Sequence, residues 1–133
     1  MTVEEYHAAI DAQMTETEHQ IRLFEELELL VPRYPELIDC FHIANGELRA
    51  KTTAARLRKM GVKPGIPDIF LPVPKHPYAG LWIELKSLRK GAKLSQDQEN
   101  MISRLRSRGY KAEVCKGWRA ALKTITDYLD IRK

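Results

Sequence analysis

The spacing of apolar residues predicts an amphipathic helix near the start of the chain. From Thr15 to about Leu30, apolar side chains recur every three or four residues among acidic ones, which is the period of one helix face. The predicted inner stripe of this helix is Ile21, Phe24, Leu27 and Leu30. Residues 1–14 precede it and are expected to form either a short extra helix or a mobile arm.

Downstream of this helix, extended and helical patterns alternate. Short apolar runs bounded by turn residues predict strands at residues 38–44, 68–71, 81–85 and 110–115. Periodic segments predict helices at residues 52–60, 95–108 and 118–129. This order predicts an α/β fold, a small mixed β-sheet flanked by helices on both faces. Residues 15–133 are expected to form one domain, because a chain of 133 residues suffices for a single core and not for two.

Composition and cysteine usage narrow the class of protein. No apolar run approaches the ~18 residues that a membrane span needs. The N-terminus is acidic and lacks the cationic start and apolar stretch of a signal peptide, so a cytoplasmic protein with no membrane partner is expected. Cys40 and Cys115 stand far apart without metal-binding spacing and are expected to be small core residues.

The charge of the chain is distributed unevenly. The net charge is +4, but residues 1–40 hold ten acidic and two basic residues, which leaves a net charge of +12 for residues 41–133. A positive field of this kind attracts phosphate polymers and supplies the salt-sensitive part of their binding. Nucleic acid is therefore the expected partner, and the alternative is a solvated surface of mixed charge.

Two predicted strands carry the candidate chemistry. Glu84 and Lys86 are two residues apart and therefore share one side of their strand. If the strand that begins at Asp68 pairs beside it, Asp68 and Glu84 can bind one Mg²⁺ or Mn²⁺ ion. Lys86 would then stabilise the attacking hydroxide or the charge that develops on phosphorus. The alternatives are a strand that simply begins with Pro-Asp and a structural ion pair between Glu84 and Lys86 or an arginine.

The same residues resemble a known nuclease signature. Pro67-Asp68 followed by Glu84-x-Lys86 looks like the PD-(D/E)xK pattern, and an ordered series of further motifs is similar to the VRR-NUC domain over roughly residues 15–129. These motifs are Asn45-Gly46 with Arg49, the basic segment 55–68, Ile83-Glu84-Leu85-Lys86, Leu94-Ser95-Gln96-Asp97-Gln98 and Gly109-Tyr110. The resemblance implies a restriction-endonuclease-like core in a protein encoded by a phage or bacterium.

The resemblance also implies further site residues. It adds the backbone carbonyl of Leu85 as a metal ligand, Glu18 as an acid that supports the metal through water, and Gln98 as a residue that orients water or phosphate. Local alternatives compete with two of these roles. Thr15-x-x-Glu18 and Ser95-x-x-Gln98 both fit a capping box, in which the acid or amide bonds back to the start of its own helix.

Basic residues around the predicted site are the expected DNA contacts. Phosphate contacts position a duplex without reading its bases, and no dedicated base-reading element is visible in the sequence. Binding is therefore expected to follow DNA structure. The resemblance favours Asn45 and Arg49 as DNA-backbone or site-support residues, although Asn45-Gly46 is most simply a turn. The other expected contacts are Arg56, Arg58, Lys59, Lys63, Arg89, Lys90 and Lys93.

Taken together, the sequence predicts a Mg²⁺- or Mn²⁺-dependent endonuclease that cleaves branched DNA such as Holliday junctions in DNA repair. A homodimer with one site for each of two strands is expected from the resemblance. The alternative from a different class is a non-catalytic basic DNA-binding module of a recombination or repair complex. A sequence-specific restriction-type nuclease is a third possibility, disfavoured because no base-reading element is visible.

Overall fold

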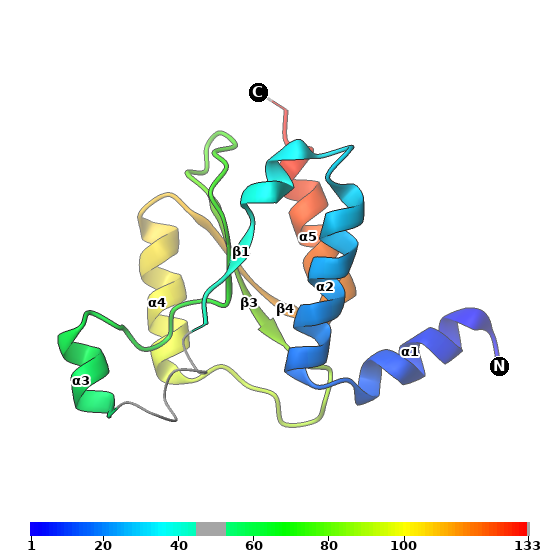
Figure 1. Ribbon diagram of the computed structural model, residues 1–133, viewed down its shortest axis with the longest axis horizontal. Helices are drawn as coiled ribbons and strands as arrows, with labels where there is room; N and C mark the ends of the chain where they lie inside the picture. The colour runs from blue at the N-terminus through cyan, green and yellow to red at the C-terminus, as the bar shows by residue number, and fades with distance from the viewer. Residues whose placement is uncertain (45–52, 133) are drawn as a thin grey trace.

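The computed structural model describes residues 1–44 and 53–132. Its helices are α1 (Val3–Gln13), α2 (Glu16–Leu30), α3 (Ala54–Lys59), α4 (Gln96–Ser107) and α5 (Trp118–Leu129), with a 3₁₀ helix η1 at Pro35–Asp39. The strands are β1 (Phe41–His42), β2 (Ile69–Leu71), β3 (Leu81–Lys86) and β4 (Lys111–Lys116). Figure 1 shows the sheet lying between α4 on one side and the pair α2 and α5 on the other.

The four strands form one mixed sheet in the order β1-β2-β3-β4. β1 pairs antiparallel with β2, and β2 pairs antiparallel with β3, with Ile69 opposite Ile83. β3 pairs parallel with β4, and α4 forms the crossover connection that a parallel pair requires. The predicted mixed sheet flanked by helices is confirmed.

The main core lies between the sheet and the helices α2 and α5. Leu81, Ile83 and Leu85 alternate along β3 and face this side, where α5 contributes Ala121 and Ile125. The inward residues of α2 are Leu23 and Leu27, which are both buried. The predicted stripe was therefore wrong at Ile21, which is 57% exposed because it lies on the other side of the helix from Leu23, whereas Phe24, Leu27 and Leu30 pack in or against the core as predicted.

Several predicted elements differ from the structure at their ends. Residues 38–44 were predicted as one strand, but Pro35 starts the 3₁₀ helix η1, which leaves only a two-residue β1. α3 begins after the N-cap Thr53 and is shorter than predicted. The predicted limits of α5 are confirmed, and Gly109 follows α4 with the positive φ of 92° that a helix C-terminus favours.

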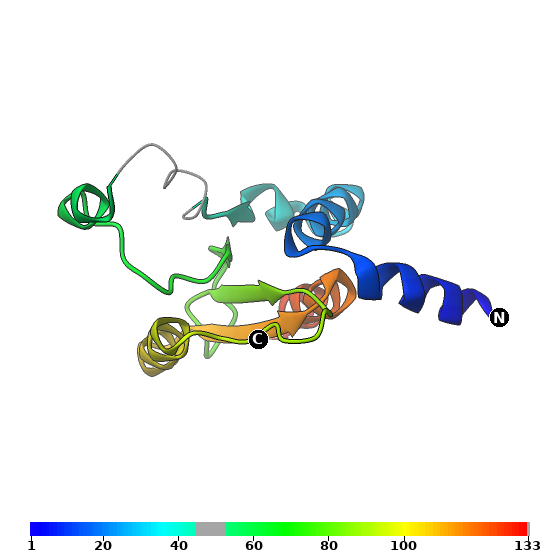
Figure 2. The same cartoon turned by 90° about the horizontal axis from the view of Figure 1, so that it is seen from below.

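Residues 1–14 were expected to form either a short helix or a mobile arm, and the structure has the helix α1 there. α1 extends away from the sheet, as Figures 1 and 2 show, and its C-terminal end is attached to the body. Asp11 accepts hydrogen bonds from Trp118 Nε1 at 3.3 Å and from Arg119 Nε at 2.7 Å. Cys40 and Cys115 are buried free thiols, as predicted. Within the described part of the chain, none of the helices has the length and apolarity needed to cross a membrane.

Candidate metal centre

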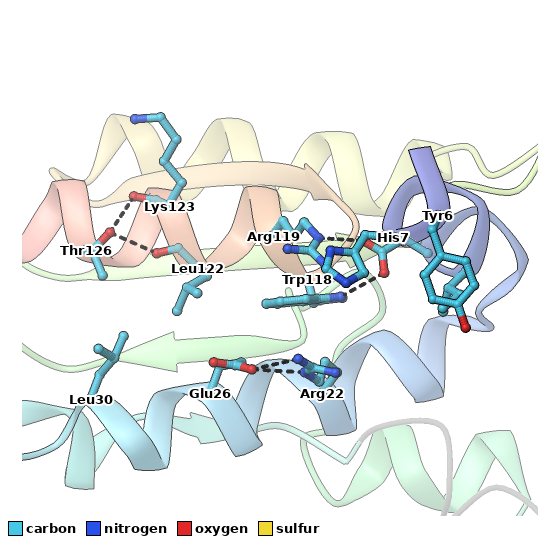
Figure 3. A pocket seen from close by; sticks show the side chains of 12 residues that line it. Tyr6, His7, Arg22, Glu26, Leu30, Trp118, Arg119, Leu122, Lys123 and Thr126 are labelled. Carbon is cyan, nitrogen blue, oxygen red and sulfur yellow. Dashed lines mark hydrogen bonds and ion pairs between the residues drawn. The ribbon is translucent and has the colours of Figure 1, made fainter. Parts of the chain in front are cut away.

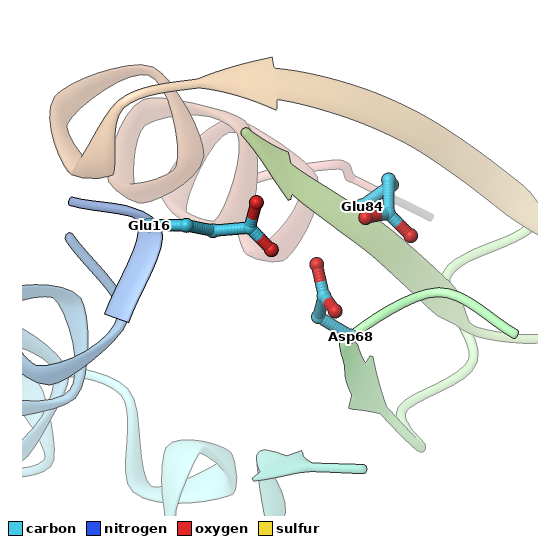
Figure 4. A group of neighbouring side chains, drawn as sticks. All are labelled: Glu16, Asp68 and Glu84. Atoms are coloured by element: carbon cyan, nitrogen blue, oxygen red, sulfur yellow. The ribbon is translucent and has the colours of Figure 1, made fainter. Parts of the chain in front are cut away.

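Three carboxylates converge at one end of the β2–β3 pair (Figure 4). Asp68 directly precedes β2, Glu84 lies on β3, and Glu16 projects from the first turn of α2. One oxygen atom from each of the three lies within 4.8 Å of the others. The antiparallel register places Asp68 across from Glu84, since Ile69 is the partner of Ile83. Asp68 and Glu84 therefore share one side of the sheet, as the sequence predicted.

Asp68 is held in place by the neighbouring strand. Its Oδ2 accepts a hydrogen bond from the backbone N–H of Leu85 at 2.9 Å. Its backbone carbonyl accepts from the N–H of Ile43 at 2.7 Å and lies 2.9 Å from Nδ1 of His42. Because both the side chain and the main chain of Asp68 are bonded, its carboxylate is held in a defined position close to those of Glu84 and Glu16. The ligand role of the Leu85 carbonyl stays a prediction.

The acidic residue of α2 that reaches the site is Glu16, which the sequence analysis missed. Glu18 was predicted there, but its Oε1 accepts from the backbone N–H of Thr15 at 3.0 Å, while Thr15 Oγ1 accepts from the N–H of Glu18 at 3.1 Å. These bonds to Thr15 lower the pKa of Glu18. The capping box therefore engages Glu18 and leaves Glu16 free to face the strands.

A signal in the sequence could have identified Glu16. It lies seven and eleven residues before Leu23 and Leu27, which are the buried positions of the same helix. Residues at these spacings share one helix face. The inward face of α2 therefore extends from the core residues to the acidic site. The stripe predicted through Ile21 did not follow this face and so did not include Glu16.

The buried carboxylate of Glu84 is the electrostatic centre of the site. Glu84 is 1% exposed, and its Oε1 has no hydrogen-bond partner among the residues that the structure describes. Burial raises the pKa of Glu84 to about 9; a hydrogen bond with Asp68 and the charges of Asp68 and Glu16 act in the same direction, and Lys86 opposes them. Burial, followed by the charge of Asp68, also raises the pKa of Glu16. Three carboxylates in this environment repel one another unless a cation joins them.

The residues present fit a hard divalent cation. Mg²⁺ and Mn²⁺ are bound by carboxylate oxygens together with waters, and a bound cation reverses the cost of ionising buried acids. The unpartnered Oε1 of Glu84 is the specific observation in favour, since a buried polar oxygen normally has a partner. Asp68, Glu84 and Glu16 could together hold one such ion.

Lys86 lies beside these carboxylates and is positioned from two sides. Its Nζ is 3.8 Å from Glu84 Oε2 and donates a hydrogen bond to Gln98 Oε1 at 3.3 Å. Gln98 Oε1 also accepts from the backbone N–H of Ser95 at 2.9 Å. Gln98 therefore takes part in the capping box of α4, as one of its two alternatives predicted, and also contacts Lys86, whereas its predicted role in orienting water or phosphate stays a prediction.

The chain segment before Asp68 packs directly on the start of α4. An added Cβ at Gly65 would lie 2.3 Å from the backbone oxygen of Asp97, and Gly65 has a φ of +82°. Only glycine fits such a close approach without displacing the backbone. This contact connects the segment that presents Asp68 with the helix turn that presents Gln98.

The predicted DNA contacts fall into three groups. Arg89 Nε donates to the backbone carbonyl of Gln13 at 3.1 Å, so its guanidinium attaches α1 to the body. Asn45 and Arg49 lie outside the described residues. The remaining predicted contacts are exposed, and their role in binding DNA stays a prediction: Arg56, Arg58, Lys59, Lys63, Lys90 and Lys93.

One pocket lies away from the acidic site. It measures about 740 Å³ and lies between α1, α2 and α5 (Figure 3). Its charged residues are already paired: Arg22 with Glu26 at 2.9 Å and Arg119 with Asp11 at 2.7 Å. Arg22 and Arg119 also stack on Trp118. None of the carboxylates of the acidic site lines this pocket, so we place the chemistry at Glu16, Asp68 and Glu84.

Comparison with known proteins identifies the family. A solved structure described as "VRR_NUC domain protein" has a TM-score of 0.63 and 24% sequence identity to this chain, and the match covers 90% of this chain and 92% of that one. This likeness shows the fold. No curated protein matches the chain. The sequence profile of the VRR-NUC domain matches residues 5–118, which is most of the chain, and the protein therefore belongs to the VRR-NUC family, whose domain is a nuclease-type module.

Proposed function

We propose that the protein is a Mg²⁺- or Mn²⁺-dependent endonuclease of the PD-(D/E)xK type that hydrolyses phosphodiester bonds in branched DNA such as four-way junctions. The observation that carries this proposal is the convergence of Glu16, Asp68 and Glu84 within 4.8 Å, with Lys86 beside them. Binding alone would not require a buried carboxylate with an unpartnered oxygen. Residues 15–133 would act as a single nuclease domain, with α1 attached to it.

Each side chain has a role that follows from its position. Asp68 and Glu84 would hold the cation, with Glu16 and the Leu85 carbonyl completing the protein ligands. When bound, the cation supplies a hydroxide nucleophile by lowering the pKa of water and neutralises charge on the phosphate. Lys86, a point charge held by Gln98, would stabilise the negative charge that develops on phosphorus as the bond to the leaving oxygen breaks.

The charge distribution supports DNA as the substrate. Residues 41–133 carry a net charge of +12, and exposed arginine and lysine side chains lie on α3 and on the loop between β3 and α4. Such residues contact phosphates and give affinity that falls with salt. Because phosphate contacts do not read bases, the protein would select its DNA by structure and not by sequence.

A homodimer would place one active site on each of two opposed DNA strands. Sedimentation of the protein with and without a four-way junction tests this. A monomer under both conditions would contradict it.

A cleavage assay tests the proposal. Labelled four-way junction, flap and linear duplex are incubated with the protein in Mg²⁺, Mn²⁺ or EDTA. We expect metal-dependent cleavage of branched DNA by the wild-type protein and none by Asp68→Ala or Lys86→Ala, while both variants still bind DNA. Glu25→Gln, an exposed acid on α2, is the matched control and keeps full activity. Binding without cleavage by the wild-type protein would instead favour a non-catalytic DNA-binding module.

A further inference from the structure

A row of aromatic rings crosses the sheet next to the acidic site. Phe41, Phe70 and Trp82 occupy paired positions on β1, β2 and β3. The rings of Phe70 and Trp82 are stacked at 4.2 Å between centroids, and Phe41 meets Phe70 edge-on at 5.9 Å. Tyr110 closes the group at 6.1 Å from Phe70 and 6.2 Å from Trp82. These four residues are called the aromatic row below.

The aromatic row lies on the same side of the sheet as the carboxylates. Trp82 and Glu84 are two residues apart on β3, and Phe70 and Asp68 are two residues apart at β2, so each pair points the same way. Two residues of a strand span roughly 7 Å. A nucleotide whose phosphate lies at Asp68 and Glu84 therefore has its base, or that of its neighbour, within reach of the row.

Three observations separate the aromatic row from an ordinary core. The main core lies on the opposite side of the sheet, under α2 and α5, and the row is not part of it. Phe41 is 47% exposed at the edge strand β1, whereas Phe70, Trp82 and Tyr110 are half-buried. In addition, Nε1 of Trp82 is buried without a hydrogen-bond partner among the described residues. A buried indole N–H normally has an acceptor, so the described part of the chain leaves a polar group of the aromatic row unsatisfied, which is unusual for a side chain that serves only as core.

We propose that the aromatic row binds an unpaired nucleobase next to the cleaved phosphate. Aromatic side chains beside a positively charged surface are the usual platform for bases outside a duplex, because only an unpaired base exposes its ring face. This inference rests on the proposed endonuclease and narrows its substrate. Among branched DNAs, those that present an unpaired nucleotide at the cleavage point would be preferred over fully paired duplex.

The binding test measures the contribution of the unpaired base to affinity separately from that of the sugar-phosphate backbone. Affinity is measured by fluorescence anisotropy, with Ca²⁺ in place of Mg²⁺, for three duplexes of one sequence: one with a single-nucleotide bulge, one with an abasic bulge and one fully paired. We expect the wild-type protein to bind the nucleotide bulge at least about 5-fold more tightly than the abasic bulge. Equal affinity for these two DNAs would overturn the proposal.

Substitutions at Phe41 test the contact itself. Phe41→Tyr keeps a flat ring and is expected to keep the preference, whereas Phe41→Leu keeps an apolar side chain and is expected to lose it. Leu29→Ala, which changes an exposed apolar residue on α2, is the control and is expected to behave as the wild type. A Phe41→Leu protein that still prefers the nucleotide bulge would contradict the role of the row.

Cleavage of the same DNAs in Mg²⁺ separates the two proposals. Cleavage that does not depend on the bulged base would leave the endonuclease intact and remove the base-binding role. A preference for the base with no cleavage of any DNA would leave the aromatic row intact and remove the endonuclease.

Discussion

The ammonium group of Lys86 and the amide oxygen of Gln98 are joined by a hydrogen bond of 3.3 Å, and the same oxygen accepts the backbone N–H of Ser95 at 2.9 Å. The residue that caps α4 is thus also a residue that positions the candidate catalytic lysine. A helix start is a rigid place from which to hold a flexible side chain, because its backbone is fixed by the helix itself. Capping and site geometry are therefore coupled in this fold.

Substitution at Gln98 should reveal this coupling. We expect Gln98→Ala to lower kcat by about 10-fold, since Lys86 loses its positioning partner. It should also lower the free energy of unfolding by about 1 kcal/mol through loss of the cap. Ser95→Ala removes the hydrogen bond from the Gln98 N–H to Ser95 Oγ and leaves the contact of Gln98 with Lys86, so it should reduce stability similarly with a much smaller effect on kcat. Equal kcat values for the two variants would contradict the positioning role.

The stability of the metal-free protein should fall as pH rises. The folded protein keeps the Glu84 proton to about pH 9, whereas the reference pKa of this carboxyl is 4.5. Between these values the folded state binds more protons than the unfolded state, so the free energy of unfolding decreases with rising pH. At pH 8 we expect Glu84→Gln to be more stable than the wild type by about 1–3 kcal/mol.

Urea denaturation of the metal-free protein at pH 5 and pH 8 measures this difference. The exposed Glu25→Gln serves as the control and should follow the wild type at both values. The interpretation would be incorrect if Glu84→Gln were less stable than the wild type at pH 8.

Divalent cations should stabilise the protein, and more strongly at higher pH. Metal binding requires ionised carboxylates and therefore releases the proton held by Glu84, whose pKa burial raises to about 9. At a free Mg²⁺ concentration about 100 times the Kd, the gain is about 2.7 kcal/mol. We expect a larger rise of Tm at pH 8 than at pH 6, measured against EDTA. Asp68→Ala should show no rise at either pH.

The two acidic residues at the start of α2 should behave differently. Glu16→Gln is expected to weaken Mg²⁺ binding by about 10-fold or more, because it removes one of three converging carboxylates. Glu18→Ala is expected to lower the free energy of unfolding by about 1 kcal/mol through loss of the capping box. Its affinity for Mg²⁺ should be unchanged. Isothermal titration calorimetry and thermal unfolding separate these effects, and a loss of Mg²⁺ affinity only in Glu18→Ala would reverse the assignment.

Substitutions at Gly65 and Gly61 test the close contact between the segment before Asp68 and the start of α4. Both have positive φ, but an added Cβ has nothing within 4 Å at Gly61 and would strike the Asp97 backbone at Gly65. We expect Gly61→Ala to be destabilised by about 1–2 kcal/mol from the backbone conformation alone. Gly65→Ala should lose about 1–3 kcal/mol more, because the chain must move away from α4. Equal losses would show that the close approach is unimportant for stability.

The sequence by itself determined those features that depend on local geometry. Strand side chains alternate with a period of two, so Glu84 and Lys86 had to share a face opposite Leu85. Both capping boxes were visible because their bonds join residues three apart on one helix turn. The limits of α5 followed from its apolar period in the same way, and the ordered motifs were enough to indicate the VRR-NUC family.

The tertiary structure alone decided which residues meet across the fold. Whether Glu16 or Glu18 reaches Asp68 depends on the rotation of α2 about its axis, which is set by the packing of Leu23 and Leu27 against the sheet and α5. Tertiary packing also determined that Arg89 donates a hydrogen bond to the backbone carbonyl of Gln13 at the end of α1. Such contacts join residues far apart in the chain, and their geometry follows from the shape of the whole core, which no short segment of sequence contains.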